Sequence, residues 1–437
     1  MEWWAWLTFL FFAFVILLVL GVRVAFGFLL ISAAGMYLFF NGTPGLRQLI
    51  QTMFSSIAGF HLLPLPLFIL MGELLFRGRL ADQALDSLDK WIGGVPGRLA
   101  LLAVAGGALF SVMTGASMAT TALLGATLVP DMEKRGYKKS MTIGPILGSG
   151  TLAVMIPPTG LGVTLAAIAE ISVGETLVAI ILPGILMAVL YTTYILTRCI
   201  LQPSIAPSYD VAWTPIRERV MAFLLHVIPL GFLVFLVIGL IFLGVATPSE
   251  SAATGAMGSI ILLAAKRSLN RRVLSESIRA TVALSGAIFI IIAAATAFSQ
   301  VLAASGATQG LIRFVTGLQV SPMTAILFMM LVVLILGCFM EPVSIMLITI
   351  PIFMPVVKSL GFDPIWFAVV MLMNIEVATI SPPFGLVLFV MKGVSPPDTT
   401  MGDVYYAALP FNFIIILSMC IVIVFPSIAL FLPGLMR

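Results

Sequence analysis

The stretch that decides the fold is GSGTLAVMIPPTG at residues 148–160, because NIEVATISPPFG at residues 374–385 repeats its pattern. The proline pair at 157–158 matches the pair at 382–383, which lies 225 residues further along the chain. Two adjacent prolines remove backbone donors and interrupt a helix. Each stretch therefore predicts a helix that is broken midway, and the constant offset predicts an internal repeat.

The composition excludes a soluble fold. Of the 437 residues, 61% are hydrophobic and only 9% are charged, and the mean hydropathy is +1.19. An average soluble domain has about 25% charged residues. Apolar runs long enough to cross a bilayer core of ~30 Å recur from end to end. We therefore expect an all-α polytopic membrane protein, and we expect Arg23 to divide its start into two retained spans rather than a signal peptide.

Two segments differ from simple spans. Residues 98–130 and 322–355 are each long enough to enter the membrane and return, and each is interrupted midway, by TGAS at 114–117 and by EPVS at 341–344. The offset of the proline pairs also lays these two clusters over each other. We interpret both segments as re-entrant helical hairpins.

The basic residues give an orientation, because Lys and Arg near the ends of spans favour the cytoplasm. Basic clusters occur at 77–79, 134–139, 198–219 and 266–279. If all are cytoplasmic, the first hairpin opens inward, the second opens outward, and both termini are periplasmic. The two repeats then have inverted topologies, an arrangement typical of transporters.

The chain divides into five predicted parts. They are N-terminal scaffold helices at 1–58, repeat 1 at 59–198, a cytoplasmic linker at 199–219, scaffold helices and a second arm at 220–279, and repeat 2 at 280–437. Repeat 1 contains an arm helix at 77–94, a hairpin at 98–130 and a broken helix at 140–169. Repeat 2 contains a hairpin at 322–355, a broken helix at 364–391 and a last helix at 405–432.

Several function classes are disfavoured. The three cysteines are scattered and there are only two histidines, so zinc or thiol chemistry has no spacing to support it. The net charge of +4 is small and lies in loops, which does not indicate nucleic acid. An intramembrane enzyme would need paired acids or a Ser/His dyad, which the spans do not offer. We expect no enzymatic activity, and a purely structural or channel-forming bundle stays open as an alternative.

The broken helices are the predicted chemical sites. Carbonyls freed at membrane depth are tolerated where they line a cavity or meet a ligand, and half-helix N-termini carry positive partial charge. One site can thus bind a small cation and an anionic group. The alternative is that the proline pairs only bend helices and that Ser and Thr hydroxyls bond back to their own helix.

The polar residues near the breaks fall into three groups. Glu341, in the second hairpin tip, is an intramembrane carboxylate and predicts a cation ligand, against a snorkelled or protonated residue. Glu376 could serve the same site or hold the broken helix by a hydrogen bond. Ser111, Thr120 and Thr121 are typical of helix-packing hydroxyls.

At this point the residues resemble a family. GALFSVMTGASMAT at 107–120, MIPPTG at 155–160, GVATPSESAA at 244–253 and NIEVATISPPFG at 374–385 are together similar to the large membrane subunit of tripartite ATP-independent periplasmic (TRAP) transporters. The resemblance implies an elevator mechanism in which a transport domain slides against a scaffold, driven by a Na⁺ gradient. It also implies two partners, a periplasmic substrate-binding protein and a small membrane subunit of about four helices.

The resemblance implies residue roles as well. One Na⁺ site would comprise Thr114, Gly115, Ser117, Ser149, Gly150, Ile156 and Pro157; another would comprise Glu341, Ser344, Thr379 and Ser381; and the implied substrate residues are Ala116, Pro158, Thr159, Gly160, Asn374, Pro383 and Gly385. This chain departs from many relatives at Ala116, where they have serine, and at Glu341, where they have aspartate.

The resemblance implies Na⁺-coupled uptake of a small organic anion, of the carboxylate or sulfonate class, across the bacterial inner membrane. Two or more Na⁺ sites are expected. The main alternative is an autonomous ion-coupled carrier for di- or tricarboxylates that needs no binding protein. The missing double Ser-Asn-Thr tips argue against that alternative.

Overall fold

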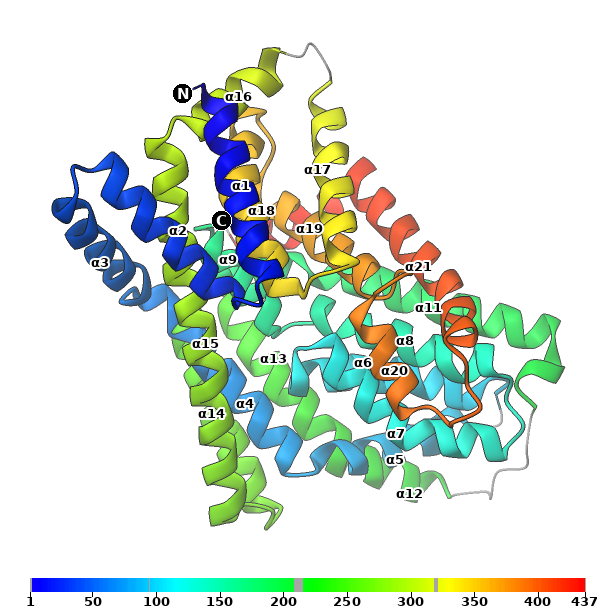
Figure 1. Ribbon diagram of the computed structural model, residues 1–437. Coiled ribbons are helices and arrows are strands. Elements are labelled where there is room, and N and C mark those ends of the chain that lie inside the picture. The colour runs from blue at the N-terminus through cyan, green and yellow to red at the C-terminus, as the bar shows by residue number, and fades with distance from the viewer. Residues whose placement is uncertain (1, 94, 208–214, 318–320, 437) are drawn as a thin grey trace.

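The computed structural model describes residues 2–93, 95–207, 215–317 and 321–436, apart from the side chains of Leu18, His61, Ala81, Asp82, Val112 and Thr114. Every regular element in these ranges is a helix (Figure 1). Part of the predicted linker at 199–219 lies outside the described residues.

The first half contains α1 (Trp3–Val19), α2 (Val24–Phe39), α3 (Thr43–Ile57), α4 (Pro64–Arg77), α5 (Leu80–Ile92), α6 (Arg98–Thr114), α7 (Ser117–Lys134), α8 (Lys139–Met155), α9 (Gly160–Ile168), α10 (Val173–Ala179) and α11 (Ile181–Leu201). The second half contains α12 (Ile216–Ala222), α13 (Ile228–Phe242), α14 (Pro248–Ala265), α15 (Arg271–Ala304), α16 (Ala307–Gly317), α17 (Pro322–Gly337), α18 (Pro342–Ser359), α19 (Pro364–Thr379), α20 (Leu386–Val394), α21 (Met401–Val424) and α22 (Ser427–Leu435). A π-helix at Phe223–Val227 joins α12 to α13.

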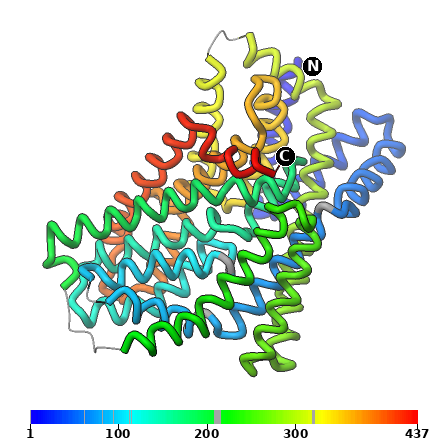
Figure 2. Tube along the Cα trace, turned by 180° about the vertical axis from the view of Figure 1, so that it is seen from behind, coloured from blue at the N-terminus to red at the C-terminus, as the bar shows by residue number. Residues whose placement is uncertain are grey.

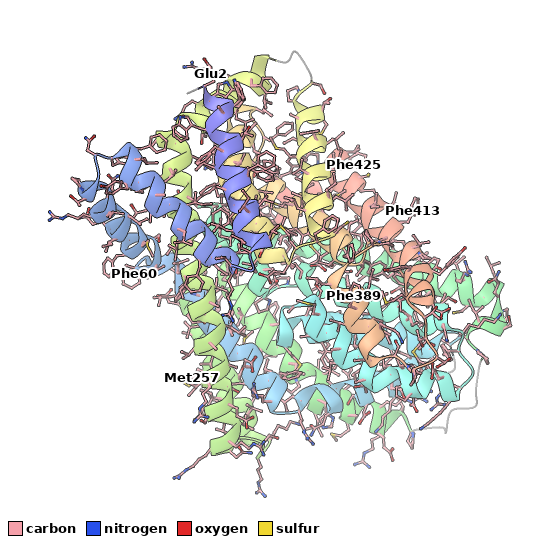
Figure 3. All side chains as sticks on the ribbon, viewed as in Figure 1. Glu2, Phe60, Met257, Phe389, Phe413 and Phe425 are labelled. Atoms are coloured by element: carbon pink, nitrogen blue, oxygen red, sulfur yellow. The ribbon has the colours of Figure 1, made fainter. Side chains whose placement is uncertain are left out.

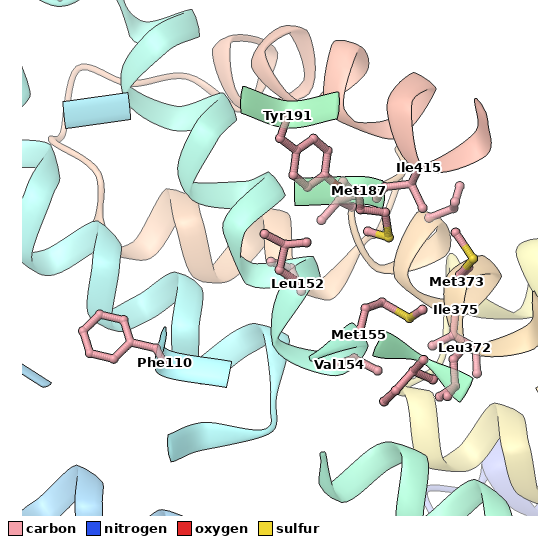
Figure 4. Packing of buried hydrophobic residues seen from close by; sticks show 14 of the residues in the cluster. Phe110, Leu152, Val154, Met155, Met187, Tyr191, Leu372, Met373, Ile375 and Ile415 are labelled. Carbon is pink, nitrogen blue, oxygen red and sulfur yellow. The ribbon is translucent and has the colours of Figure 1, made fainter. Parts of the chain in front are cut away.

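Two helices form the centre of the molecule. All residues from Met141 to Met155 in α8 and from Ile365 to Thr379 in α19 are buried. A helix that is apolar on every side is one that other helices surround. Figure 4 shows this packing, with Leu152 and Met155 of α8 near Met187 of α11 and Ile415 of α21.

The hairpin arms pack against these two helices. Helices α6 and α7 contact α8, whereas α17 and α18 contact α19, and α21 contacts both central helices. The view from behind shows α11 beside α21 and α22 (Figure 2). Each half therefore wraps one central helix, and α21 joins the halves.

A second group of helices stands beside this body. Helix α15 runs along α2, α3 and α4, and α14 packs between α4 and α13 (Figure 1). The middle of α15 buries a run of small side chains, Ala293, Ala294, Ala295 and Ala297, and the last three pack in one cluster with Phe28 of α2 and Ile348 of α18. Helix α15 thus touches both the N-terminal helices and an arm of the second predicted hairpin.

The outer surface suits a membrane. Within the described residues, five helical stretches are long and apolar enough to cross one, namely 173–201, 216–242, α15, α18 and α21, and the bent pair α8 and α9 makes a sixth if it is one span. Large apolar side chains are exposed around the outside, such as Met257 on α14 and Phe413 and Phe425 at α21 (Figure 3). Lipid chains would cover such a surface.

Small residues let the helices approach closely. A Cβ built on Gly107 of α6 would lie 2.7 Å from the carbonyl oxygen of Ser149 in α8, and one on Gly144 would lie equally close to the carbonyl oxygen of Ala407 in α21. Lipid tails are as apolar as side chains, so close packing rather than the hydrophobic effect holds membrane helices together.

The structure differs from the prediction at two boundaries and adds two helices. The second arm, placed at the end of the part at 220–279, is the first part of the continuous helix α15, because no proline interrupts residues 271–304. The last helix, placed at 405–432, ends at Val424, because Pro426 cannot continue it. Helices α3 and α16 were not predicted, since each is short and amphipathic rather than uniformly apolar.

A substitution tests the close approach of α6 and α8. Gly107→Ala places a methyl group against backbone of α8, which cannot retreat without moving the helix, and we expect it to destabilise the fold by about 1–3 kcal/mol. Gly286→Ala is the matched control, because a Cβ there meets no atom within 4 Å. Thermal unfolding of the purified protein in detergent measures both, and equal unfolding temperatures for the two variants would contradict the packing argument.

Candidate functional site

The first hairpin turns at Gly115 and Ala116. Gly115 has φ +56, a left-handed conformation that glycine adopts without strain, and Ala116 is extended before α7 begins at Ser117. A Cβ built on Gly115 would lie 3.0 Å from the backbone nitrogen of Gly160. The tip of the hairpin therefore touches the break between α8 and α9.

That break bends the chain by 46°. Ile156 is extended after the end of α8, the Pro157–Pro158 peptide is cis, and α9 begins at Gly160. Thr159 is fully buried, and its hydroxyl has no hydrogen-bond partner among the described residues. Its Cα lies 3.6 Å from the Cβ position built on Gly115. A buried hydroxyl beside the hairpin tip is thus available to a ligand.

A cavity of about 340 Å³ opens beside this contact. Four predicted site residues line it: Gly115, Ala116, Pro158 and Gly160. Its other lining residues are Phe68, Ile69, Gly72, Glu73 and Phe76 of α4, Met113 of α6, Met118 and Ala119 of α7, and Leu284 of α15. The volume suits a small organic molecule.

Two hydroxyl groups of α8 donate hydrogen bonds to their own helix. The Ser149 hydroxyl donates to the Pro145 carbonyl, and the Thr151 hydroxyl donates to the Gly148 carbonyl at 2.7 Å. Such hydrogen bonds from a hydroxyl to its own helix are what we expect under the alternative in which the proline pairs only bend helices. A hydroxyl that donates its hydrogen still presents oxygen lone pairs, however, and these are what a cation binds.

The predicted ligand Gly150 lies against α7. A Cβ built on Gly150 would meet the Thr121 hydroxyl oxygen and would lie 3.0 Å from the Ser117 carbonyl oxygen. The Thr121 hydroxyl is buried without a partner among the described residues, so Thr121 does not bond back to its helix as Ser111 does. The side chain of Thr114, another predicted ligand, lies outside the described residues.

Glu376 connects the two halves of the chain. It is fully buried in α19, and its Oε2 accepts a hydrogen bond of 2.6 Å from the Ser117 hydroxyl at the first hairpin tip. Its Oε1 has no partner within the described part of the chain. The sequence left open whether Glu376 serves the second site or braces its own helix, and the carboxylate instead reaches the tip of the other half.

The second hairpin tip meets the second break. The rings of Phe339 and Phe384 are 5.5 Å apart, and the Cys338 thiol donates to the Pro382 carbonyl over 3.8 Å. A Cβ built on Gly337 would meet the side chain of Ala378 in α19. Both halves thus place a hairpin tip against a helix break, and both proline pairs contain a cis peptide.

The second set of predicted cation ligands is divided between the tip and the break. Glu341 is the residue before α18, and one of its carboxylate oxygens accepts from the Ser344 hydroxyl at 3.3 Å. Thr379 donates to the Glu376 carbonyl at 2.9 Å and Ser381 donates to the Val377 carbonyl at 2.7 Å. The side chain of Glu341 is exposed, whereas that of Ser344 is buried.

The remaining predicted substrate residues do not line the cavity. Asn374 is buried and donates at 2.6 Å to the Met330 carbonyl of α17, which fixes the hairpin arm to α19. The Pro383 carbonyl accepts from the Tyr405 hydroxyl at 2.7 Å. Gly385 packs against its own loop, because a Cβ there would lie 2.8 Å from the Ser381 carbonyl oxygen.

Sequence reasoning missed other polar groups of this region. Glu73 lines the cavity, and Thr121, which the sequence analysis interpreted as a helix-packing hydroxyl, lies beside Gly150. The Tyr191 hydroxyl lies 2.9 Å from that of Thr151, and Asn412 donates at 2.7 Å to the Ile380 carbonyl. A single acidic or amide residue within an apolar stretch marks such a position in the sequence. The sequence does not show which distant helix supplies the hydrogen-bond partner of that residue.

Known proteins were compared with the chain. The family model described as the tripartite ATP-independent periplasmic transporter, DctM component, matches residues 11–428. The C4-dicarboxylate TRAP transporter large permease protein DctM of Pseudomonas aeruginosa is 33% identical, over 89% of this chain and 90% of that protein. The ectoine TRAP transporter large permease protein TeaC of Halomonas elongata is 28% identical, over 96% and 97%.

Two solved transporters share the fold at low identity. The YdaH transporter of Alcanivorax borkumensis superimposes with a TM-score of 0.59 at 16% identity, over 90% of each chain, and MtrF of Neisseria gonorrhoeae does so with 0.59 at 14%, over 89% of this chain and 84% of that one. The relatives are transporter permeases rather than enzymes. The family model covers almost the whole chain, which therefore belongs to the DctM family of TRAP transporter large permeases and is a multi-pass membrane protein.

Proposed function

We propose that this protein performs Na⁺-coupled uptake of a small organic acid, of the carboxylate or sulfonate class, across the bacterial inner membrane. The match of the DctM family model over residues 11–428 carries the proposal. Relatives are named for C4-dicarboxylates, ectoine and isethionate, so the family handles small organic solutes of differing charge. The cavity of about 340 Å³ at the first hairpin tip has a size that fits such solutes.

Two Na⁺ sites are proposed, one at each pairing of a tip with a break. The first uses the TGAS tip and the stretch from Ser149 to Pro157, and the second uses Glu341, Ser344 and the hydroxyls of Thr379 and Ser381. Hydroxyl, carbonyl and carboxylate oxygens are hard ligands suited to a small alkali cation. The Ser149, Thr379 and Ser381 hydroxyls all donate to their own helix, which leaves oxygen lone pairs for the ion.

The proposed movement is of the elevator type. The two hairpins, the two broken helices and α21 would move as one body against α1–α4 and α13–α15. Three observations support one body: the repeat offset of 225 residues, the contact of α21 with α8 and α19, and the hydrogen bond between Ser117 and Glu376 across the halves. We further propose that the two repeats have inverted topologies and that both termini are periplasmic.

Two protein partners are proposed. One is a periplasmic binding protein that delivers the substrate, and the other is a small membrane subunit. A relative from Oleidesulfovibrio alaskensis is named an isethionate TRAP transporter permease protein DctMQ. The match spans 96% of this chain but only 65% of that protein. The extra length there fits a small subunit fused to a large one.

The first prediction concerns the driving ion and the partners. Proteoliposomes that contain this protein with its small subunit should take up a labelled organic acid only when the binding protein is present and Na⁺ is higher outside. Replacing Na⁺ by K⁺ at equal ionic strength should abolish uptake. Uptake by this chain alone would instead establish an autonomous carrier, and unsaturable flux would establish a channel.

The second prediction concerns Glu341. Glu341→Ala removes the only charged ligand of the second proposed Na⁺ site and should reduce Na⁺-driven uptake by roughly a hundredfold or more, since a charged ligand is worth several kcal/mol in such a site. Membrane insertion should be normal. Glu218→Ala, an exposed acid on α12, is the control and should transport normally. An unchanged Na⁺ dependence in Glu341→Ala would remove this residue from the site.

The third prediction concerns the link between the halves. Ser117→Ala leaves the buried Glu376 carboxyl without its hydrogen-bond donor and should destabilise the protein by about 1–3 kcal/mol. Ser111→Ala is the matched control on the same hairpin, because that hydroxyl donates only to the Ala108 carbonyl of its own helix. Thermal unfolding in detergent compares the two. Similar losses from both would show that the cross-half hydrogen bond contributes little.

A further inference from the structure

The cavity at the first hairpin tip contains one ionisable side chain. Of the thirteen described residues that line it, Glu73 alone is polar, and the others are aliphatic, aromatic, thioether-bearing, proline or glycine residues. Ligand cavities are mostly apolar, and a few placed polar groups fix the orientation of what binds. Glu73 therefore marks where a polar group of the occupant lies.

The carboxylate of Glu73 is only partly engaged. Its Oε2 accepts a hydrogen bond of 2.8 Å from Nε of Arg77, one turn along α4, and its Oε1 has no partner among the described residues. The side chain is 21% exposed. One carboxylate oxygen thus remains open to a ligand that enters the cavity.

Arg77 forms a second ion pair in addition to the one with Glu73. Its Nη1 lies 3.1 Å from Oε2 of Glu276 on α15, and Glu276 in turn binds Arg272 at 2.8 Å. Neither Arg77 nor Glu276 lines the cavity. The basic groups therefore stay behind the cavity wall, and the charge presented to the cavity is negative.

The opposite side of the cavity carries positive partial charge. Helix α7 begins at Ser117 and α9 begins at Gly160, and the cavity is lined by Ala116, directly before α7, and by Gly160, the first residue of α9. Helix N-termini carry positive partial charge and favour anionic groups. An occupant between these walls meets partial positive charge at the hairpin tip and a carboxylate at α4.

We propose that the transported acid is a zwitterion, and that Glu73 receives its cationic group, a protonated amine or amidinium. This inference rests on the proposed function, in which the cavity takes a small organic acid, and it adds that the anionic end of the acid lies at the hairpin tip. A dicarboxylate would place its second carboxylate against Glu73, and like charges at short range repel. Glu73 therefore selects for a net-neutral substrate and against dianions.

The test uses two compounds of matched length. 4-Aminobutyrate carries a carboxylate and an ammonium group, and succinate carries two carboxylates on a chain of similar reach. Each is titrated against the complex of this protein with its small subunit in Na⁺ and in K⁺, with the unfolding temperature as the readout of binding. The variants are Glu73→Gln, which keeps an acceptor for Arg77, and Glu276→Gln, which removes the charge of the other partner of Arg77 outside the cavity.

The expected result separates the two variants. The wild type should bind 4-aminobutyrate in a Na⁺-dependent manner and more tightly than succinate. Glu73→Gln should weaken 4-aminobutyrate binding by roughly tenfold to a hundredfold, the range for a lost hydrogen bond between charged groups, and should improve succinate binding. Glu276→Gln should keep the wild-type preference.

Other outcomes overturn the inference. A wild type that binds succinate more tightly, or a Glu73→Gln variant that keeps the wild-type preference, removes Glu73 from substrate selection. Equal changes in both variants would show that Glu73 acts only through Arg77. These results leave the proposed Na⁺-coupled uptake intact, whereas the absence of any Na⁺-dependent binding of either compound overturns the proposed function together with this inference.

Discussion

A chain that interrupts its helices inside a bilayer must satisfy the freed backbone groups within the protein, because the hydrocarbon offers no hydrogen bonds. In this protein a hairpin tip packs against each break. The tip at Gly115 covers the break before Gly160, and the tip at Phe339 covers the break at Phe384. Because a hairpin tip lies against each break, the arms of the hairpins pack around α8 and α19, and these two helices lie at the centre.

The same constraint explains the small residues. A hairpin can cover a break only if its arms approach the broken helix closely, and Gly107 and Gly144 allow backbone to meet backbone at α8. The packing that brings the tips to the breaks also leaves the cavity beside the first tip. Cavity, breaks and glycines are thus consequences of one requirement of the backbone.

The sequence predicted the elements that carry strong local signals. The proline pairs predicted both helix breaks, and the TGAS cluster predicted the turn at 115–116. The turn of the second hairpin lies at 338–341 and shares only Glu341 with the predicted cluster at 341–344. It could not predict the continuity of α15, because a charged first stretch followed by an apolar one also fits two separate helices. It could not pair Ser117 with Glu376 or place Glu73 in the cavity, because 259 residues separate the first pair and only the tertiary fold brings α4 to the tip.

The run of buried alanines on α15 has a kinetic meaning. Ala294, Ala295 and Ala297 pack in one cluster with residues of α2 and α18, and this short stretch has shallow grooves between the larger side chains of Ile292 and Phe298. Ridges that interdigitate must climb over one another when packed helices shift, and shallow ones resist less. In the elevator movement that we propose, the moving body would meet low resistance along this stretch, which would affect the speed of each crossing rather than the two resting positions.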